Sequence, residues 1–546
     1  MLHDLQNPKA QLVQALFMAG LAITCLSVAA QERAFFKNPV IPGDFPDPSV
    51  IRVGEDYWAM TTTGTWAPHF PILHSRDLVN WRIVGYVFQQ RPSWVKSDFW
   101  APEIVHDRGR FLVYYTARRD DGAGKVGSLC VAVTTASAPT GPYIDHGALV
   151  CEIAELKNVG SIDAFFIRDE QNIPYLIWKA DGNDAEPDQP SSIFAQRLSE
   201  DGLTLLGKRQ EILRNTEPWE RHVTEGSFIL RRGGWFYHFY SGNACCGRGC
   251  KYALGVARAR RLLGPWEKSK NNPILVDNED WQCPGHGSIV STPDGRDILL
   301  YHSYRKRRDT FSIGREALLD EVQWDQDGWP VINSGNGPTS IAAAPLGVAQ
   351  PKNKTEFFDG FNAAQLGFDW QWPMFFDQEA RVEVAGGGYL ILKSRNGAQN
   401  DEFTGAAVAR RSVSGDFVAT TLAEARGASA RSRAGLSIYS WRDRSIGIAV
   451  GGGQVMLWRR EGKAAHTLAT MKAPRARALY LRMTAKNGEL YRFSYSADGR
   501  DWTELGDTVN GGHIEGARVA LTGSGAPNAV ARFAWIRITP TVTEKK

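Results

Sequence analysis

Five ionisable residues recur at nearly regular steps of 56, 60, 62 and 61 residues: Asp47, Glu103, Asp163, Glu225 and His286. Each opens a segment in which a short apolar stretch, a turn of Gly, Asp or Asn, and an aromatic strand follow one another. Carboxyl groups that gather in twos or threes can do acid–base chemistry, because like-charge repulsion keeps one protonated while another stays ionised. Cleavage of a glycosidic bond needs such a pair, one carboxylate as base or nucleophile and one carboxylic acid as proton donor.

These side chains can act together only if the fold brings them to one place. A period near sixty residues, made of short strands with no long amphipathic helix between units, is typical of a β-propeller. The inner strand of each blade lines the central channel, so equivalent positions converge on its axis. An acid beside a turn is usually a solvated cap, but burying several like charges around one axis costs free energy unless they are paired or functional. The sequence therefore predicts an all-β fold with a five-bladed propeller and a polar cluster at its centre.

The composition is consistent with this fold and excludes several other classes. With 43% hydrophobic and 22% charged residues in 546, the chain is not wholly disordered, collagenous or coiled-coil. Its 54 Gly, 18 Trp, 16 Tyr and 25 Phe suit short strands, tight turns and sugar-binding clefts. A net charge of +4 gives no reason to expect nucleic acid or an anionic membrane as partner. The sequence contains no Gly-x-Ser-x-Gly elbow, His-Glu-x-x-His motif, phosphate loop or dinucleotide fingerprint.

Six short segments, in order along the chain, resemble the motifs of glycoside hydrolase family 43, the five-bladed propeller glycosidases. They are residues 38–49 (NPVIPGDFPDPS), 74–81 (HSRDLVNW), 100–103 (WAPE), 160–163 (GSID), 224–226 (TEG) and 285–288 (GHGS). The resemblance implies that Asp47 is the general base, Glu225 the general acid, and Asp163 an auxiliary carboxylate that tunes and orients the acid. It also implies inversion at the anomeric centre, for which the two acting carboxyl groups lie about 6.5–9.5 Å apart.

Five further residues are candidates for substrate contact. The resemblance matches His286 to a channel histidine that in some members ligates calcium or its waters; no cofactor is expected to be required. It matches Arg315 to an arginine that contacts substrate hydroxyls, with a surface salt bridge as the alternative. Trp100 and Glu103 are predicted to shape the sugar subsite. Trp66 either stacks on a sugar or packs between blades.

The composition changes after residue 335. We expect a propeller over residues 31–335, a linker over 336–354 and a β-sandwich over 355–546, because alternating strands and Gly-rich turns fill the last segment. Residues 358–361 (FDGF), with Leu366 and residues 370–372 (WQW), resemble the concanavalin-like C-terminal domain of family 43 β-xylosidases and arabinofuranosidases. In such relatives this domain can contribute a loop to the active site. Residues 375–376 are a candidate for that loop, with burial in the core as the alternative.

The N-terminus and the cysteines indicate an exported protein. Residues 1–30 are interpreted as a signal peptide, because an apolar run precedes small residues at a cleavage position. An uncleaved membrane anchor and a lipoprotein site at Cys25 are the alternatives. Six cysteines then remain, an even number that permits disulfides in a secreted or periplasmic protein: Cys130, Cys151, Cys245, Cys246, Cys250 and Cys283. For the three in residues 245–250, a disulfide-pinned loop is favoured over a zinc knuckle, because a second ligand pair at metal spacing is absent.

Together, these observations favour an exported, inverting exo-glycosidase with an oligosaccharide substrate, cleaving β-D-xylosidic or α-L-arabinofuranosidic bonds. No membrane insertion is expected once the signal is removed. One alternative is an endo-arabinanase, which needs an open groove. A second is a carbohydrate-binding propeller without catalysis, which would tolerate the loss of one of the three carboxylates. A third is a structural repeat scaffold, which would leave the repeated polar residues unexplained.

Overall fold

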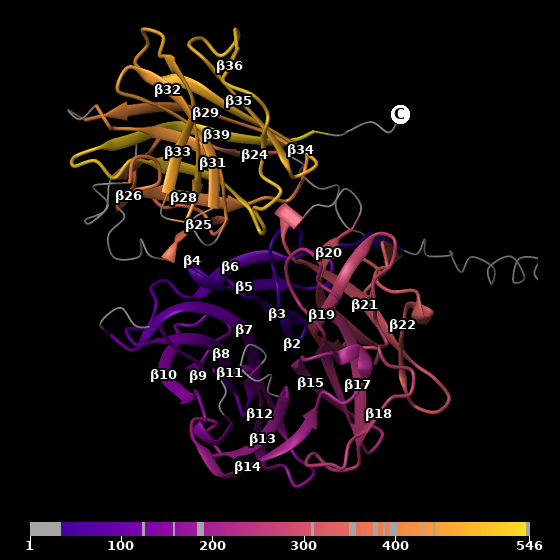
Figure 1. Ribbon diagram of the computed structural model, residues 1–546. Helices are drawn as coiled ribbons and strands as arrows, with labels where there is room; N and C mark the ends of the chain where they lie inside the picture. The colour runs from indigo at the N-terminus through magenta and orange to yellow at the C-terminus, as the bar shows by residue number, and fades with distance from the viewer. Residues whose placement is uncertain are drawn as a thin grey trace, which may run out of the picture.

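The computed structural model shows two β-rich parts stacked on one another (Figure 1). It describes residues 34–122, 126–156, 159–182, 190–306, 311–348, 356–374, 381–385, 388–393, 401–427, 430–440, 444–462 and 464–541. The expected signal peptide and the loop candidate at residues 375–376 lie outside these ranges. Across the described residues, no helix is both long enough and apolar enough to cross a membrane.

In the described part of the N-terminal half, most strands group into five antiparallel units of four, of which units 2 and 3 are joined into one sheet by a parallel pairing of Gly160 with Leu129. Unit 1 holds β2 (Ser49–Val53), β3 (Asp56–Met60), β5 (His69–Ser75) and β6 (Arg82–Phe88). Unit 2 holds β7 (Val95–Asp107), β8 (Arg110–Asp120), β9 (Val126–Ala136) and β10 (Ile144–Val150). Unit 3 holds β11 (Gly160–Arg168), β12 (Pro174–Asp181), β13 (Ser192–Leu198) and β14 (Leu205–Arg214). Unit 4 holds β15 (Thr224–Arg232), β16 (Trp235–Gly242), β17 (Ala253–Ala259) and β18 (Glu267–Lys268), and unit 5 holds β19 (Trp281–Ser291), β20 (Asp297–Arg305), β21 (Glu316–Trp324) and β22 (Pro330–Ile332).

The first strand of each unit carries one of the five repeated residues or, in unit 1, begins two residues after it, and near that residue the backbone leaves the regular extended conformation. Asp47, Ala101, Asp163, Gly226 and His286 all have positive φ, between 41° and 63°. In units 2 to 5 the strand pairing also shifts register there, as in a β-bulge. Such strained positions persist only where the surrounding structure enforces them, and they concentrate at functional sites.

This geometry corrects the assumption that the five repeated residues share one phase. Asp47, Asp163 and His286 do occupy equivalent positions. Glu225 stands one residue before the equivalent position, which is Gly226, and Glu103 stands two residues after it, because Ala101 is the equivalent residue of unit 2.

The first strand, β1 (Phe35–Lys37), pairs with β23 (Ile341–Ala343) at the other end of the propeller segment. Part of the segment expected as a linker is therefore a strand that holds the two ends of this half together. The short helices of the described residues, η1 (Ala154–Leu156), η2 (Pro218–Glu220), η3 (Phe311–Ile313) and η4 (Asn333–Gly335), all lie in connections.

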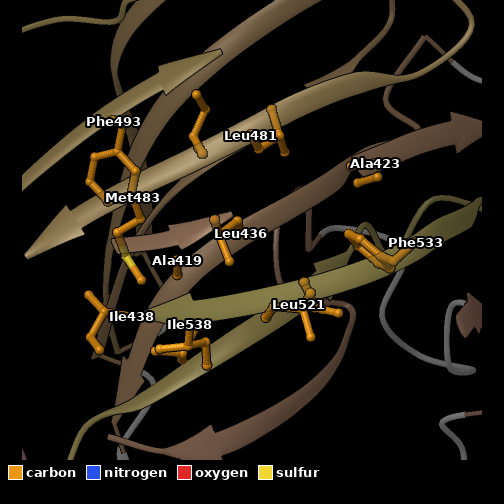
Figure 2. Packing of buried hydrophobic residues seen from close by; sticks show 14 of the residues in the cluster. Ala419, Ala423, Leu436, Ile438, Leu481, Met483, Phe493, Leu521, Phe533 and Ile538 are labelled. Carbon is orange, nitrogen blue, oxygen red and sulfur yellow. The ribbon is translucent and has the colours of Figure 1, made fainter. Parts of the chain in front are cut away.

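The C-terminal half is a sandwich of two antiparallel sheets around one apolar core. One sheet contains β24 (Phe357–Asp359), β26 (Arg381–Ala385), β27 (Tyr389–Lys393), β29 (Phe417–Arg426), β34 (Leu479–Lys486), β35 (Leu490–Ser496), β36 (Thr503–Glu504), β37 (Val509–Asn510) and β39 (Val530–Pro540). The other contains β25 (Trp370–Pro373), β28 (Ala406–Arg411), β30 (Ala434–Ser440), β31 (Arg444–Gly451), β32 (Gln454–Glu461), β33 (Ala464–Lys472) and β38 (Arg518–Gly523). Figure 2 shows side chains of both sheets, such as Leu436, Met483 and Phe533, meeting in this core.

The two halves share a β-ladder. The short strand β4 (Trp66–Ala67), between β3 and β5 of unit 1, pairs with β25 and extends the second sheet of the sandwich (Figure 1). Trp66 is 2% exposed; Arg518 lies over its ring at 4.3 Å, and Tyr439 meets it edge-on at 5.4 Å. Trp66 therefore packs between the two domains, and the prediction that it stacks on a sugar is wrong.

Candidate active site

Three buried carboxyl groups and one histidine gather where the bulges converge. Asp47, Asp163 and Glu225 are 7 to 9% exposed. Nδ1 of His286 lies 3.5 Å from Oδ1 of Asp47 and 3.8 Å from Oδ2 of Asp163. These four residues come from units 1, 3, 4 and 5, so the tertiary fold brings together positions up to 239 residues apart in the chain.

Asp47 is held as a carboxylate by its neighbours. Its Oδ1 accepts a hydrogen bond from Nη1 of Arg315 at 2.9 Å, and its Oδ2 accepts one from the Thr62 hydroxyl at 2.7 Å. His302 lies 3.2 Å from Oδ1. Burial opposes ionisation, but the Arg315 guanidinium, together with His286, outweighs it and holds the pKa of Asp47 well below its usual range. An ionised carboxylate with a free lone pair is what a general base requires.

Asp163 has the opposite tendency. Burial is the largest influence and raises its pKa to about 6, with the negative charge of Glu225 acting in the same direction and His286 against it. Its Oδ2 accepts the backbone N–H of Gly226 at 3.0 Å. Gly226 is required here, since its φ is +63° and an added Cβ would lie 2.9 Å from Cγ of His286. The backbone beside Glu225 is thus tied directly to Asp163.

Glu225 is fixed through both carboxyl oxygens. Oε2 accepts a hydrogen bond from Nζ of Lys179 at 2.6 Å, and Oε1 accepts one from the Tyr252 hydroxyl at 2.9 Å. Burial favours the protonated form, but the Lys179 ammonium outweighs it and lowers the pKa of Glu225. Asp163 and Glu225 are therefore two neighbouring acids whose surroundings drive their pKa values apart, the arrangement expected of an acid–base site.

A set of polar side chains that the sequence analysis missed supports the bulges. In four units a residue in the second strand, or just after it in unit 1, accepts the N–H of the positive-φ residue of the following unit. Thr62 accepts from Ala101 at 2.7 Å and Thr116 from Asp163 at 3.2 Å. Ser241 accepts from His286 at 2.9 Å and His302 from Asp47 at 3.1 Å. The available signal was a polar residue directly after the aromatic strand segment, as in Tyr115-Thr116, Tyr240-Ser241 and Tyr301-His302.

Two of the remaining substrate-contact candidates lie near the site. Arg315 contacts Asp47, as described, so it belongs to the cluster and is not a surface salt bridge. Trp100 is half-buried and occupies the strand position equivalent to Glu225, opposite Thr116 as Glu225 is opposite Ser241. This position is compatible with a role in the sugar subsite.

Glu103 does not belong to the cluster. Its carboxyl accepts a hydrogen bond from the Ser49 hydroxyl at 2.6 Å, and it lines a cavity of about 700 Å³ formed by later residues of the same inner strands. Burial raises its pKa to about 8. The prediction that Glu103 shapes the sugar subsite is therefore wrong, because two residues of extra strand length carry its side chain further along the channel.

The cysteines form disulfides between Cys130 and Cys151, between Cys245 and Cys246, and between Cys250 and Cys283. The Cys245–Cys250 loop is thus pinned to β19, as the disulfide interpretation predicted. In the described ranges, no group of three or more His, Cys, Asp and Glu side chains is arranged to hold a metal ion. The positive charges of Arg315 and Lys179 already balance the carboxylates around His286. The calcium ion at His286 therefore stays a prediction, and no step of the proposed mechanism depends on it.

The sandwich contacts the loop that leads to Asp47. Nε of Arg411 donates to the carbonyl oxygen of Asp44 at 2.9 Å, and the Arg411 guanidinium lies over the Phe45 ring at 4.2 Å. Nη1 of Arg518 lies 3.7 Å from the Asp44 carboxylate. Close by, the Tyr304 hydroxyl donates a hydrogen bond to Oε1 of Glu515. The second domain therefore holds the backbone immediately before the candidate base.

Comparison with known proteins agrees with this architecture. The family model "Glycosyl hydrolases family 43" matches residues 36–330, and "Beta xylosidase C-terminal Concanavalin A-like domain" matches residues 358–539. The chain is 28% identical to "Xylosidase/arabinosidase 43B" of Humicola insolens, over 87% of this chain and 89% of that one. It is 26% identical to "Xylan 1,3-beta-xylosidase" of a Vibrio species, over 87% and 91%.

The structural comparison gives the same fold. The crystal structure of the GH43 BlXynB protein from Bacillus licheniformis matches with a TM-score of 0.77 at 25% identity, over 93% of this chain and all of that one. This likeness confirms the predicted class, a β-propeller followed by a concanavalin-like sandwich. Because the family model covers more than half of the chain, and all six motif segments lie within its match, this protein is a glycoside hydrolase that belongs to glycosyl hydrolase family 43.

Proposed function

We propose that this protein is an inverting exo-glycosidase that releases β-D-xylose or α-L-arabinofuranose from plant cell-wall oligosaccharides. The observation that carries the proposal is the cluster of three buried carboxyl groups whose partners differ. Asp47 is ionised beside Arg315, while Asp163 and Glu225 form a neighbouring pair that shares a raised and a lowered pKa. The relatives named for xylosidase and arabinosidase activity support the choice of sugars.

In this mechanism Asp47 removes a proton from a water molecule as the water attacks the anomeric carbon. Glu225 gives its proton to the glycosidic oxygen as the bond to the leaving sugar breaks, so the new bond forms on the opposite face and the configuration inverts. The proton held by the acid pair must then reside on Glu225. Without substrate, burial and Lys179 together favour the proton on Asp163; the Gly226 N–H and His286, which stabilise the ionised form of Asp163, act in the direction that the reaction needs.

Exo action is supported by the second domain, which packs against residues 44–45 immediately before the base. An endo-arabinanase needs a groove open at both ends, and a domain that closes over this loop works against such a groove. A binding propeller without catalysis has no need to keep three carboxyl groups buried at the cost of their desolvation.

The test is product analysis with an aryl β-D-xyloside, an aryl α-L-arabinofuranoside and linear arabinan, with NMR detection of the first anomer released. We expect single sugars of inverted configuration. Glu225→Gln should lower kcat on xylo- or arabino-oligosaccharides about 10²–10⁴-fold, and much less on a dinitrophenyl glycoside, whose leaving group needs no proton. Glu211→Gln, the same change at an exposed ion pair with Arg214, is the control. Oligomeric products from arabinan would favour the endo alternative, and full activity of Glu225→Gln would refute the proposed role of this residue.

We also infer export to a secreted or periplasmic location. Three disulfides suit an oxidising compartment, and residues 1–30 have the pattern of a cleavable signal. N-terminal sequencing of the mature protein tests this inference: a chain that starts near Gln31 supports it, and an intact Met1 in the cytoplasm contradicts it.

A further inference from the structure

Each of the five units has one equivalent residue next to the candidate site. In four units this residue makes the same hydrogen bond, and in one unit it cannot. Thr62, Thr116, Ser241 and His302 each accept the bulge N–H of the following unit. The equivalent residue of unit 3 is Lys179, which pairs with Ile162 as His302 pairs with Gly285. A lysine ammonium has three donors and no acceptor, so it cannot perform this task.

The exception occurs at the junction that leads to the candidate proton donor. The Gly226 N–H, which Lys179 cannot accept, is bound instead by Oδ2 of Asp163 at 3.0 Å. Lys179 is 1% exposed, and its Nζ donates to Oε2 of Glu225 at 2.6 Å while lying 3.4 Å from Oδ1 of Asp181. The presence of a lysine at this position therefore has two consequences. The carboxylate of Asp163 binds the backbone beside Glu225, and a cation lies against the Glu225 carboxyl group.

We propose that Lys179 is a positioning residue for the proton donor: it holds the carboxyl group of Glu225 in place and sets the pH at which Glu225 gives up its proton. This inference rests on the proposed role of Glu225 as the general acid. Lys179 acts through Glu225 and is assigned no contact with the sugar. With Tyr252 on the other oxygen, it leaves the carboxyl group little freedom to rotate.

The charged and titratable groups that face Glu225 determine the direction of the effect. Lys179 and Asp181 come from β12, Asp163 from β11, His286 from β19, and Tyr252 from the segment before β17. Burial and Asp163 both favour protonated Glu225, whereas Lys179, His286 and the Tyr252 hydroxyl favour the ionised form. Removal of the lysine charge leaves burial less opposed, so Glu225 keeps its proton to higher pH.

The experiment measures kcat/KM against pH for the wild type and for Lys179→Met with an aryl β-D-xyloside and an aryl α-L-arabinofuranoside. The alkaline limb of a bell-shaped profile reports the loss of the acid's proton. We expect Lys179→Met to move this limb upward by about one pH unit or more. Its kcat should fall about 10-fold or more, because the donor is less well oriented, while KM changes little. Lys179→Arg should keep the limb near its original pH.

Two further variants make the test specific. Lys268→Met removes a partly buried lysine, 14% exposed, whose Nζ lies 2.6 Å from a buried glutamate, Glu220, in the same domain, and it should leave the limb unchanged. Asp181→Asn removes the competing anion from Lys179 at a partly exposed position. It should move the limb downward, which keeps the inference testable if Lys179→Met does not fold.

An unshifted limb in Lys179→Met, or an upward shift in Asp181→Asn, overturns the inference. An equal shift in Lys268→Met also overturns it, because the effect would then come from general destabilisation. A wild-type protein that cleaves neither glycoside refutes the proposed function instead, and the two failures are therefore distinguishable.

Discussion

Asp163 is predicted to make the folded protein less stable at neutral pH than it would be with a neutral side chain there. Burial raises the pKa of Asp163 from its ordinary 3.8 to about 6. At about 1.4 kcal/mol per pH unit, ionising this buried group in the native state therefore costs about 3 kcal/mol. Asp163→Asn removes the charge and retains an oxygen that can accept the Gly226 N–H, so this variant should be inactive and yet more stable at pH 7.

The sign of the pH dependence follows from linkage. A raised native pKa means that the folded state binds the proton more tightly than the unfolded state does. The protonated Asp163 side chain therefore stabilises the folded protein fully below the unfolded pKa, and this contribution is lost as pH rises through the native pKa. The stability difference between Asp163→Asn and the wild type should consequently be constant below pH 4, grow between pH 4 and 6, and level off above pH 6. For a propeller of about 300 residues, 3 kcal/mol corresponds to about 5 °C in Tm.

The assay is differential scanning calorimetry of both proteins at several pH values between 4 and 7, following the propeller transition. Asp47→Asn provides the contrast, because the pKa of Asp47 is held low by Arg315. Its stabilising ionisation is fully present above pH 4, so this variant should be less stable than the wild type by an amount that is constant from pH 4 to 7. A difference for Asp163→Asn that does not grow between pH 4 and 6, or that has the opposite sign, would refute the reasoning about burial.

Two further predictions concern close packing. Gly226→Ala should lower kcat at least about 10-fold with little change in the overall fold, because the new Cβ meets the His286 ring at 2.9 Å in a backbone conformation with φ of +63°; unchanged kinetics would show that the ring has room to move. Trp66→Ala should destabilise the protein by about 3–5 kcal/mol in thermal or denaturant unfolding, because the ring is buried against Tyr439 and Arg518. A raised KM without loss of stability in this variant would instead place Trp66 on the substrate.

Much of the fold and the main members of the site could be read from local patterns. The sixty-residue repeat predicts strands in groups, and the same grammar in each group indicates a closed, repetitive architecture. Asp47, Asp163 and His286 were found in this way, because residues at one phase of a repeat meet on the axis of the fold, and Glu225 was found because it stands only one residue from that phase. The even number of cysteines indicated disulfides, and the pairs are now assigned.

The errors came from features that a repeat pattern does not specify. Glu103 was grouped with the other acids, but a shift of two residues from the bulge moves its side chain along the channel, and the spacing of 56 residues could not reveal which residue carries the positive φ. Trp66 is aromatic and close to the site in sequence, yet a two-residue strand adds it to the other domain. A strand of two residues is too short to show the alternation of buried and exposed residues by which strands are predicted from sequence.

The sequence by itself determined which residue types recur and how often, and hence that acids would be drawn to one axis. Only the tertiary structure decided the protonation tendency of each acid, since pKa values depend on which neighbours lie within a few ångströms. Asp47 meets Arg315, more than 260 residues away, and Glu225 meets Lys179, which stands at a ring position that other units fill with a hydrogen-bond acceptor. Burial, and contacts between charges that lie far apart in the chain, arise from tertiary packing, so a local stretch of sequence does not reveal them.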